Sequence, residues 1–233
     1  TLRGMADCLV EVRTLRHGVH SGLFGGVAPD ALTALCRLLA TLHDDDGNVA
    51  IEGLHSGPGP ELVYPLERLR SESGMLDGVE LLGSGSVVER LWNKPAVAVI
   101  ALDATPVAKA SNTLIPSARA KISLPLAPGD DAGRALRCLR RRLETHAPWG
   151  AQGTVTDGEV GQPGVIGFEG PIADLARAAV RAAWGREPVL VGQGGSIPLV
   201  AEFAAAFSGS PILVTAVADP DARWHGLHEG GHL

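Results

Sequence analysis

ADCLVEVRT, at residues 6–14, is an apolar, partly β-branched stretch that predicts a strand. The glycine-rich loop HGVHSGLFGG follows at residues 17–26. Residues 29–43 then repeat leucines at the spacing of one helix face, with Pro29 at a favoured first-turn position. The first unit of the chain is therefore predicted to be a strand, a glycine loop and an amphipathic helix.

Further elements of the same kinds follow along the chain. The apolar patterns predict strands over residues 95–102, 115–126 and 152–157, and a helix over residues 131–146 that faces Leu136, Leu139 and Leu143 inward. Residues 48–85 are rich in loops, with short helices expected at 65–72 and 86–92. The order strand, helix, strand, strand, helix, strand is that of a ferredoxin-like two-layer sandwich, which would fill residues 1–157.

A second unit is predicted over residues 158–233, after a linker rich in glycine and proline. It contains a helix from Pro171, a short strand at 189–192, a helix from Ser196 and a short strand at 212–217. This alternation predicts parallel strands. Two short strands are too few for a closed α/β domain, so this unit is expected to be a piece of one.

Charge and composition exclude several classes of partner. The chain has 20 Lys+Arg against 26 Asp+Glu, a formal charge of −6, which argues against a nucleic-acid or anionic-membrane partner. Apolar runs stay well short of the roughly 18 residues of a membrane span. The three cysteines, Cys8, Cys36 and Cys138, contain no CxxC pair and are expected to be reduced, packed thiols of a cytoplasmic protein.

Histidines are dense near the C-terminus, where His225, His228 and His232 fall within eight residues. Such density suggests metal ligation. Residues 228–232 also match the HExxH pattern, which holds zinc only when it is helical. Two adjacent glycines in that turn cost a helix about 1 kcal/mol each, so a surface turn is the favoured interpretation unless 228–232 is helical.

Two glycine loops could contact a ligand. Residues 192–198, GQGGSIP, place free backbone N–H groups at the start of a helix, where a carboxylate or an oxyanion can bind. His20 lies among the glycines of the loop at residues 17–26, and glycines let a backbone approach another surface closely. Each loop taken alone is equally explained by a structural turn.

Together these segments resemble the di-zinc metallopeptidase family of carnosinase, cytosolic non-specific dipeptidase, aminoacylase and succinyl-diaminopimelate desuccinylase. The matching stretches include HSGLFGG, LWNKPA, ASNTLIPSARAKISL, VGQGGSIPLVAEF and DPDARWHG, in order along the chain, and the dipeptidase-like branch fits best. The resemblance implies an α+β lid, or dimerisation domain, over residues 1–157. Residues 158–233 would then be the C-terminal part of an incomplete α/β zinc-peptidase catalytic domain whose N-terminal part is absent from this chain.

The resemblance also implies roles for particular residues. It makes His225 a metal ligand, and His20 an oxyanion donor that acts in trans across a homodimer formed through the lid. Substrate contacts fall to Asn112, Gly194, Gly195 and Ser196. The expected cofactor is a pair of zinc ions, with manganese or cobalt as alternatives, and the expected substrate is a dipeptide or an N-acyl amino acid. Most metal ligands of the family lie outside this chain, so the chain alone is expected to hold no metal and to be inactive.

One departure from the family pattern keeps a second interpretation open. Pro125 stands where the family has an arginine that binds the substrate carboxylate. Since proline lacks an N–H donor, Pro125 is expected at a sheet edge or a strand end. The missing ligands and Pro125 favour a non-catalytic dimerisation or binding module, whereas His20, Asn112 and His225 favour an enzyme of peptide or amide bonds.

Overall fold

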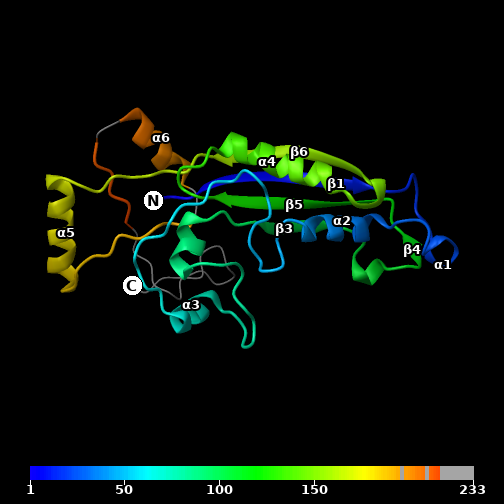
Figure 1. The fold of residues 1–233 in the computed structure, drawn as a ribbon, viewed down its shortest axis with the longest axis horizontal. Helices are drawn as coiled ribbons and strands as arrows, with labels where there is room; N and C mark the ends of the chain where they lie inside the picture. Colours follow the sequence, from blue (N-terminus) through cyan, green and yellow to red (C-terminus); the bar gives the residue numbers. More distant parts are fainter. Residues whose placement is uncertain (195–196, 208–209, 216–233) are drawn as a thin grey trace.

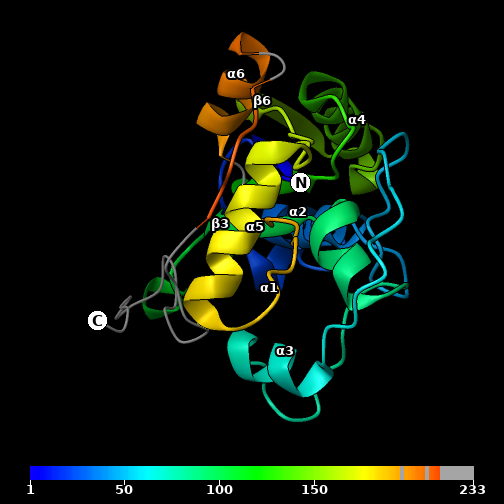
Figure 2. The same cartoon turned by 90° about the vertical axis from the view of Figure 1, so that its left-hand side faces the viewer.

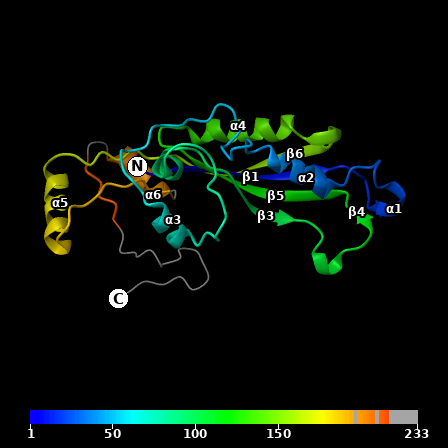
Figure 3. The ribbon, with the colours of Figure 1, turned by 60° about the horizontal axis from the view of Figure 1, so that its bottom comes forward.

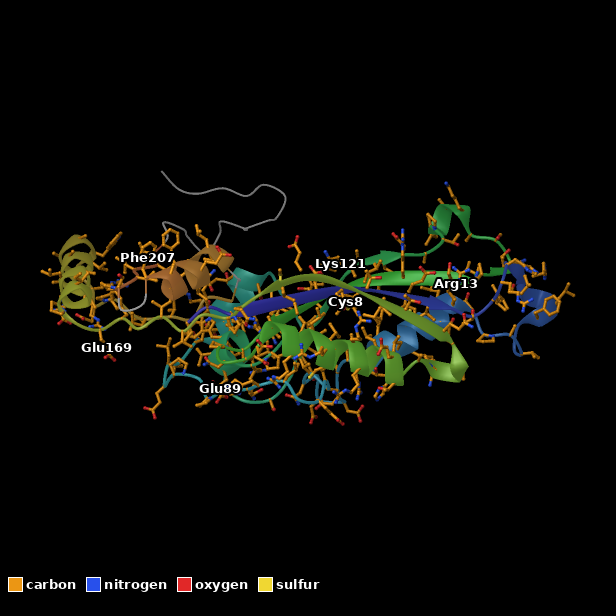
Figure 4. All side chains as sticks on the ribbon, turned by 90° about the horizontal axis from the view of Figure 1, so that it is seen from above. Cys8, Arg13, Glu89, Lys121, Glu169 and Phe207 are labelled. Carbon is orange, nitrogen blue, oxygen red and sulfur yellow. The ribbon has the colours of Figure 1, made fainter. Side chains whose placement is uncertain are left out.

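The computed structural model describes residues 1–194, 197–207 and 210–215 of the chain. One antiparallel sheet has the strand order β3–β5–β1–β6, formed by β1 (Gly4–Arg13), β3 (Ala98–Asp103), β5 (Ser117–Leu126) and β6 (Gln152–Gly161). Helix α2 (Ala31–Ala40) connects β1 to β3, and α4 (Ala132–Thr145) connects β5 to β6. Both helices cover one face of the sheet (Figure 4). The predicted ferredoxin-like two-layer fold is confirmed.

The core lies between the sheet and these two helices. Every second residue of β1, from Ala6 through Cys8 and Val10 to Val12, is fully buried, because strand side chains alternate between the two faces. Leu139 and Leu143 of α4 are buried against them, as the helix pattern predicted. The other face of the sheet carries polar side chains such as Lys121, which point away from the helices (Figure 4).

Local chemistry moves several boundaries away from the predicted ones. Helix α2 begins at Ala31 rather than at Pro29, because the Asp30 carboxylate accepts the Thr33 N–H at 2.9 Å and caps the helix there. Strand β6 runs on to Gly161, since the first half of β1 offers it a free edge and Met5 pairs with Gly161. Pro125 occupies the predicted strand end, next to the last residue of β5.

An insertion of irregular chain lies between α2 and β3. It contains α3 (Leu66–Ser73), close to the helix predicted at 65–72, and this helix lies below the sheet in the view of Figure 1. The second short helix, η1 (Glu89–Asn93), is a π-helix, and its Trp92 is buried. Two single-turn 3-10 helices lie outside this insertion: η2 (Val107–Lys109) between β3 and β4, and η3 (Pro148–Gly150) between α4 and β6.

The chain after β6 lies at one end of the sheet, where α5 (Pro171–Trp184) and α6 (Pro198–Ala206) stand in front of it in the end view of Figure 2. The prediction of strands at 189–192 and 212–217 is wrong for the described residues, through position 215. Val189, Leu190 and Val191 are more than half exposed, and among the described residues no strand pairs with them. In the described ranges no helix is long and apolar enough to cross a membrane.

Candidate functional site

Two segments far apart in the sequence form a small arm at the end of the sheet opposite α5 (Figure 3). Strand β2 (Val19–His20) pairs with β4 (Thr113–Leu114), and His20 lies directly opposite Thr113. The backbone N–H of Ser21 donates to the Asn112 carbonyl at 2.8 Å. The structure therefore brings together two of the predicted site residues, His20 and Asn112, which are both exposed.

The local fold of the arm fixes the His20 ring. His20 caps the short helix α1 (Ser21–Phe24), and its Nδ1 accepts the Gly22 N–H at 3.1 Å. An accepting Nδ1 carries no proton, so the neutral imidazole bears its proton on Nε2. A Cβ at position 22 would lie only 3.0 Å from the His20 ring, which explains the glycine there. His20 can thus donate a hydrogen bond through Nε2 to a group outside the chain.

Exposed apolar side chains follow His20 closely in the sequence of the arm. Leu23, Phe24 and Val27 are at least half exposed, and Val27 has 93% of its surface free. Adjacent exposed apolar residues are typical of a surface that another protein covers. The segment after His20 therefore presents exposed apolar surface next to the imidazole in the sequence.

The predicted residues of the second unit lie far from the arm. Gly194 is exposed at the end of the sheet where β1 begins, close to the Leu91 carbonyl of η1. Strand β1 has ten residues between the two ends, about 33 Å at 3.3 Å per residue. His20, in the arm that follows β1, and Gly194, next to the Gln193 that pairs with Leu2 just before β1, therefore stand at opposite ends of the sheet.

Other predicted site residues lie outside the described residues. These are Gly195, Ser196 and His225, together with the HExxH match at 228–232. Among the described residues, no group of three or more histidine, cysteine, aspartate or glutamate side chains could hold a metal ion. The metal-ligand prediction for His225 thus stays a prediction.

Sequence reasoning missed Arg3, a buried arginine at the junction of the two units. Its guanidinium reaches the carbonyls of Leu91 and Lys94, 88 and 91 residues further along the chain. No pattern in the sequence near residue 3 could have revealed these partners, because both are backbone atoms. Trp92, which lies between them, belongs to the LWNKPA stretch already noted for its resemblance.

The described residues form a two-layer α+β domain with a histidine arm at one end of its sheet and the helices α5 and α6 at the other (Figure 3). Residues 1–151 match the family model of the M20 peptidase dimerisation domain. The chain therefore belongs to the M20 metallopeptidase family, whose members include a metallo-carboxypeptidase of known structure from Sulfolobus solfataricus.

Curated relatives and solved structures agree with this family. The chain is 34% identical over 232 residues to a cysteinylglycine-S-conjugate dipeptidase of Corynebacterium striatum, covering 98% of this chain and 51% of that protein. It is 24% identical to the human Beta-Ala-His dipeptidase over 95% of this chain and 46% of the relative.

In structure, the chain superimposes on the dipeptidase Dug1p of Saccharomyces cerevisiae with a TM-score of 0.82 at 19% identity, over 98% of this chain and 50% of that one. Human carnosine dipeptidase 1 gives a TM-score of 0.72 at 22% identity, over 88% of this chain and 46% of the other. These two likenesses show the fold. The chain spans about half the length of the relatives it matches.

Proposed function

We propose that this chain works within a longer, metal-dependent dipeptidase, to which it supplies the lid (residues 1–157) and the C-terminal part of the catalytic domain (residues 158–233). The similarity to dipeptidases over nearly the whole chain supports this proposal. The match of residues 1–151 to a peptidase dimerisation domain supports the assignment of the lid. A cytoplasmic location stays a prediction.

The separation of the arm from the junction carries the proposal. His20 stands about 33 Å or more from Gly194 of its own chain, too far for both to contact one dipeptide. His20 therefore acts in the partner subunit of a homodimer. There its Nε2–H donates to the oxygen that gains negative charge when the scissile carbonyl is attacked, and such a donor contributes roughly 10²-fold or more to the rate.

The remaining site residues keep the roles that the family pattern implies. Asn112, on the same arm as His20, contacts the substrate, and the backbone N–H groups of Gly194, Gly195 and Ser196 hold its carboxylate or its scissile carbonyl. His225 supplies one imidazole to a pair of zinc ions, or of manganese or cobalt ions. When bound, such ions polarise the carbonyl and lower the pKa of a bound water. The other metal ligands come from the rest of the full-length protein.

Pro125 bears on which dipeptides are accepted. It offers neither a charge nor an N–H donor to a substrate carboxylate, and its carbonyl already accepts the Ala96 N–H at 3.0 Å. Recognition then depends more on the substrate side chain than in family members with an arginine at this position. S-substituted cysteinylglycine, the substrate class in the name of the C. striatum relative, is the first compound to test, with N-acyl amino acids second.

The homodimer forms through the lid, along edge strand β3. Val99, Ile100 and Leu102 of this strand are about half exposed, and the outer edge of β3 has no neighbouring strand in the described residues. Exposed edges with apolar side chains pair readily with a second strand. Ile100→Lys should shift the dimer to monomer in light scattering at tens of micromolar protein. An unchanged mass would exclude β3 as the interface.

The decisive experiment uses the full-length protein and two variants that fail for different reasons. His225→Ala should lose one metal ion and most activity, whereas His20→Ala should keep its metal and lose turnover. A mixture of the two variants should regain part of the activity, because an intact site forms when His20 and His225 come from different subunits. His17→Ala, in the same loop and equally exposed, is the matched control and should behave as wild type.

Two results would contradict this proposal in different ways. If subunits exchange and the mixture stays inactive, His20 does not act in trans. If the wild-type full-length protein binds no metal and hydrolyses no dipeptide, the alternative of a non-catalytic dimerisation or binding module takes its place. The 233-residue chain by itself should hold no stoichiometric metal and should be inactive, as metal analysis and a dipeptide assay would show.

A further inference from the structure

Three segments meet where the lid joins the second unit. Leu2 and Gly164 exchange backbone hydrogen bonds of 2.7 and 3.1 Å. On the other side of the same segment, Gln193 donates to the Thr1 carbonyl at 2.8 Å and accepts the Arg3 N–H at 3.1 Å. Residues 1–3 are thus the middle strand of a narrow strip, and residue 193 is fixed to the lid through backbone atoms.

The Arg3 side chain extends this strip to a third element, the π-helix η1. Nη1 donates to the Leu91 carbonyl at 3.1 Å, and Nη2 donates to the Lys94 carbonyl at 2.6 Å. Carbonyls at the end of a helix have no partner within it, and an arginine satisfies them well. Arg3 is 6% exposed, and its Nε has no hydrogen-bond partner among the residues that the structure describes. Burial lowers the pKa of its guanidinium to about 10.

Burial of the charged Arg3 side chain costs free energy, and its two carbonyl partners explain its structural role. Neutral carbonyls do not compensate a buried charge as a carboxylate does. The arrangement persists because the planar guanidinium spans two carbonyls in fixed positions, a task for which lysine is less suited. The consequence is geometric, because η1 cannot move relative to residue 3 without loss of both bonds.

Trp92 makes a second contact from η1 to the same segment. Its side chain is 8% exposed and packs directly on Gly192, where an added Cβ would lie 2.5 Å from Trp92 Cβ and Cγ. Two residues further on, Gly194 faces the Leu91 carbonyl. Residues 192–194, at the start of the proposed substrate loop, therefore rest on η1 and are bonded to Arg3.

We propose that Arg3 is a positioning residue that locks residues 192–194 to η1, so that the lid and the substrate loop are held in one fixed relation. The consequence for catalysis rests on the proposed function. Residues 192–194 fixed in this way hold the start of the substrate loop in place relative to the lid, and displacement by about 1 Å can cost roughly 100-fold in rate. We call the contacts of Arg3 with η1 and with Gln193 the clamp. Loss of the clamp should lower kcat more than it raises KM.

The test compares Arg3→Met, Arg3→Lys and Gly192→Ala in the full-length protein. Arg3→Met removes both hydrogen bonds and should lower kcat roughly tenfold or more with metal content unchanged. Arg3→Lys keeps the positive charge, but a single ammonium group cannot replace the two guanidinium nitrogens that bond Leu91 and Lys94. Its kcat should therefore fall between those of Arg3→Met and wild type. Gly192→Ala disturbs the same segment from the Trp92 side and should also lower kcat. Arg181→Met, an exposed arginine bonded to Glu187 at 2.7 Å, is the matched control.

Hydrogen exchange of the peptide over residues 189–194 provides a second readout that does not need activity. In Arg3→Met this peptide should exchange faster, while peptides of β1 and β5 keep their wild-type protection. Unchanged kcat and unchanged exchange would overturn the proposal, as would a general loss of protection across the lid, which would make Arg3 merely structural. If the wild-type protein is inactive, the proposed function is refuted. The hydrogen-exchange comparison would still test whether Arg3 holds residues 192–194, because it does not depend on activity.

Discussion

The lid buries its apolar side chains, whereas the chain that follows it leaves most of its large apolar side chains exposed. Every residue of the main buried cluster lies between Ala6 and Val155. After Gly161, by contrast, Ala173 is the one apolar residue that is fully buried in the described ranges. Large apolar side chains there are mostly about half exposed or more, among them Leu175, Trp184, Phe203 and Phe207.

This difference shows where the described residues enclose a hydrophobic core. The lid closes a core between one sheet face and two helices, whereas α5 and α6 have apolar surface with nothing packed on it in the described residues. A cavity of about 590 Å³ is lined mainly by apolar residues, at positions 1–2, 166, 168, 189–191, 193, 197 and 212–215. Under the proposed function, the rest of the catalytic domain covers this surface.

The largest expected effect on the free energy of unfolding comes from a pair of leucines, one in a helix of the lid and one in a helix after it. Leu139 of α4 is fully buried, and Leu175 of α5 is 70% exposed. In the 233-residue chain, Leu139→Ala should lower the free energy of unfolding by about 3 kcal/mol, through lost transfer energy and a cavity. Leu175→Ala should change it by less than about 0.5 kcal/mol. Urea unfolding followed by circular dichroism measures both.

The full-length protein sharpens the same test. If the rest of the catalytic domain covers α5, Leu175→Ala becomes a core substitution there and should cost about 2 kcal/mol. Equal costs for Leu175→Ala in the short and the full-length chain would mean that this face of α5 stays open. Similar costs for the two leucines in the 233-residue chain would contradict the contrast between the regions.

The sequence was informative where local pattern and burial agree, as in the lid. The alternation in residues 6–14 and the leucine spacing of α4 report on the same core, so strand order and helix faces could be predicted. The strand expected at 189–192 is absent because pattern and burial disagree there. Apolar residues favour a strand only where a neighbouring strand is present to pair with them. Cys36 was likewise expected to be packed but is exposed on α2.

The candidate site divides along the same line. The glycines around His20 predicted a tight loop, and the structure supports this: a Cβ at position 25 would lie 2.3 Å from the Ser21 carbonyl oxygen, and one at position 22 would lie 3.0 Å from the His20 ring. The pairing of His20 with the Asn112 segment needed the fold, because 92 residues separate them. Arg3 could not be found at all, since its partners are carbonyls whose positions no side-chain pattern records.

Two aspartates give a second, smaller test of the two regions. The Asp130 side chain has no exposed surface and accepts the N–H groups of His55 and Asp131 at 2.9 and 2.7 Å, besides pairing with Arg134. Asp130→Ala leaves these N–H donors without an acceptor and should lower the free energy of unfolding by about 2 kcal/mol. Asp130→Asn keeps an acceptor and should cost less.

Asp174 of α5 is the matched control. Its side chain is 72% exposed and pairs with Arg177 at 3.1 Å in solvent, where such pairs contribute little. Asp174→Ala should leave the unfolding midpoint unchanged. An Asp130→Ala midpoint equal to that of Asp174→Ala would show that the loop around residue 55 is not anchored by Asp130.

The smallest expected effect concerns pH and the interior of the lid. Burial, with a further contribution from the nearby Asp7 and Asp157 carboxylates, raises the pKa of the Cys8 thiol from 9.0 to about 12. Above pH 9 the unfolded thiol ionises while the folded one stays protonated, so the unfolded state binds fewer protons. Stability from this group is complete below pH 9 and is lost as pH rises from 9 toward 12.

Urea unfolding of wild type and Cys8→Ala at pH 8 to 10.5 measures this loss. Wild type should lose about 1 kcal/mol per pH unit above pH 9 relative to Cys8→Ala, because the variant has no thiol to ionise at this position. The packing cost of the alanine is the same at every pH and cancels from the slope. Cys36→Ala, which removes an exposed thiol, should keep the wild-type slope. Parallel slopes for wild type and Cys8→Ala would mean that water reaches the sheet–helix interface at Cys8, and that the lid interior is less closed than its burial indicates.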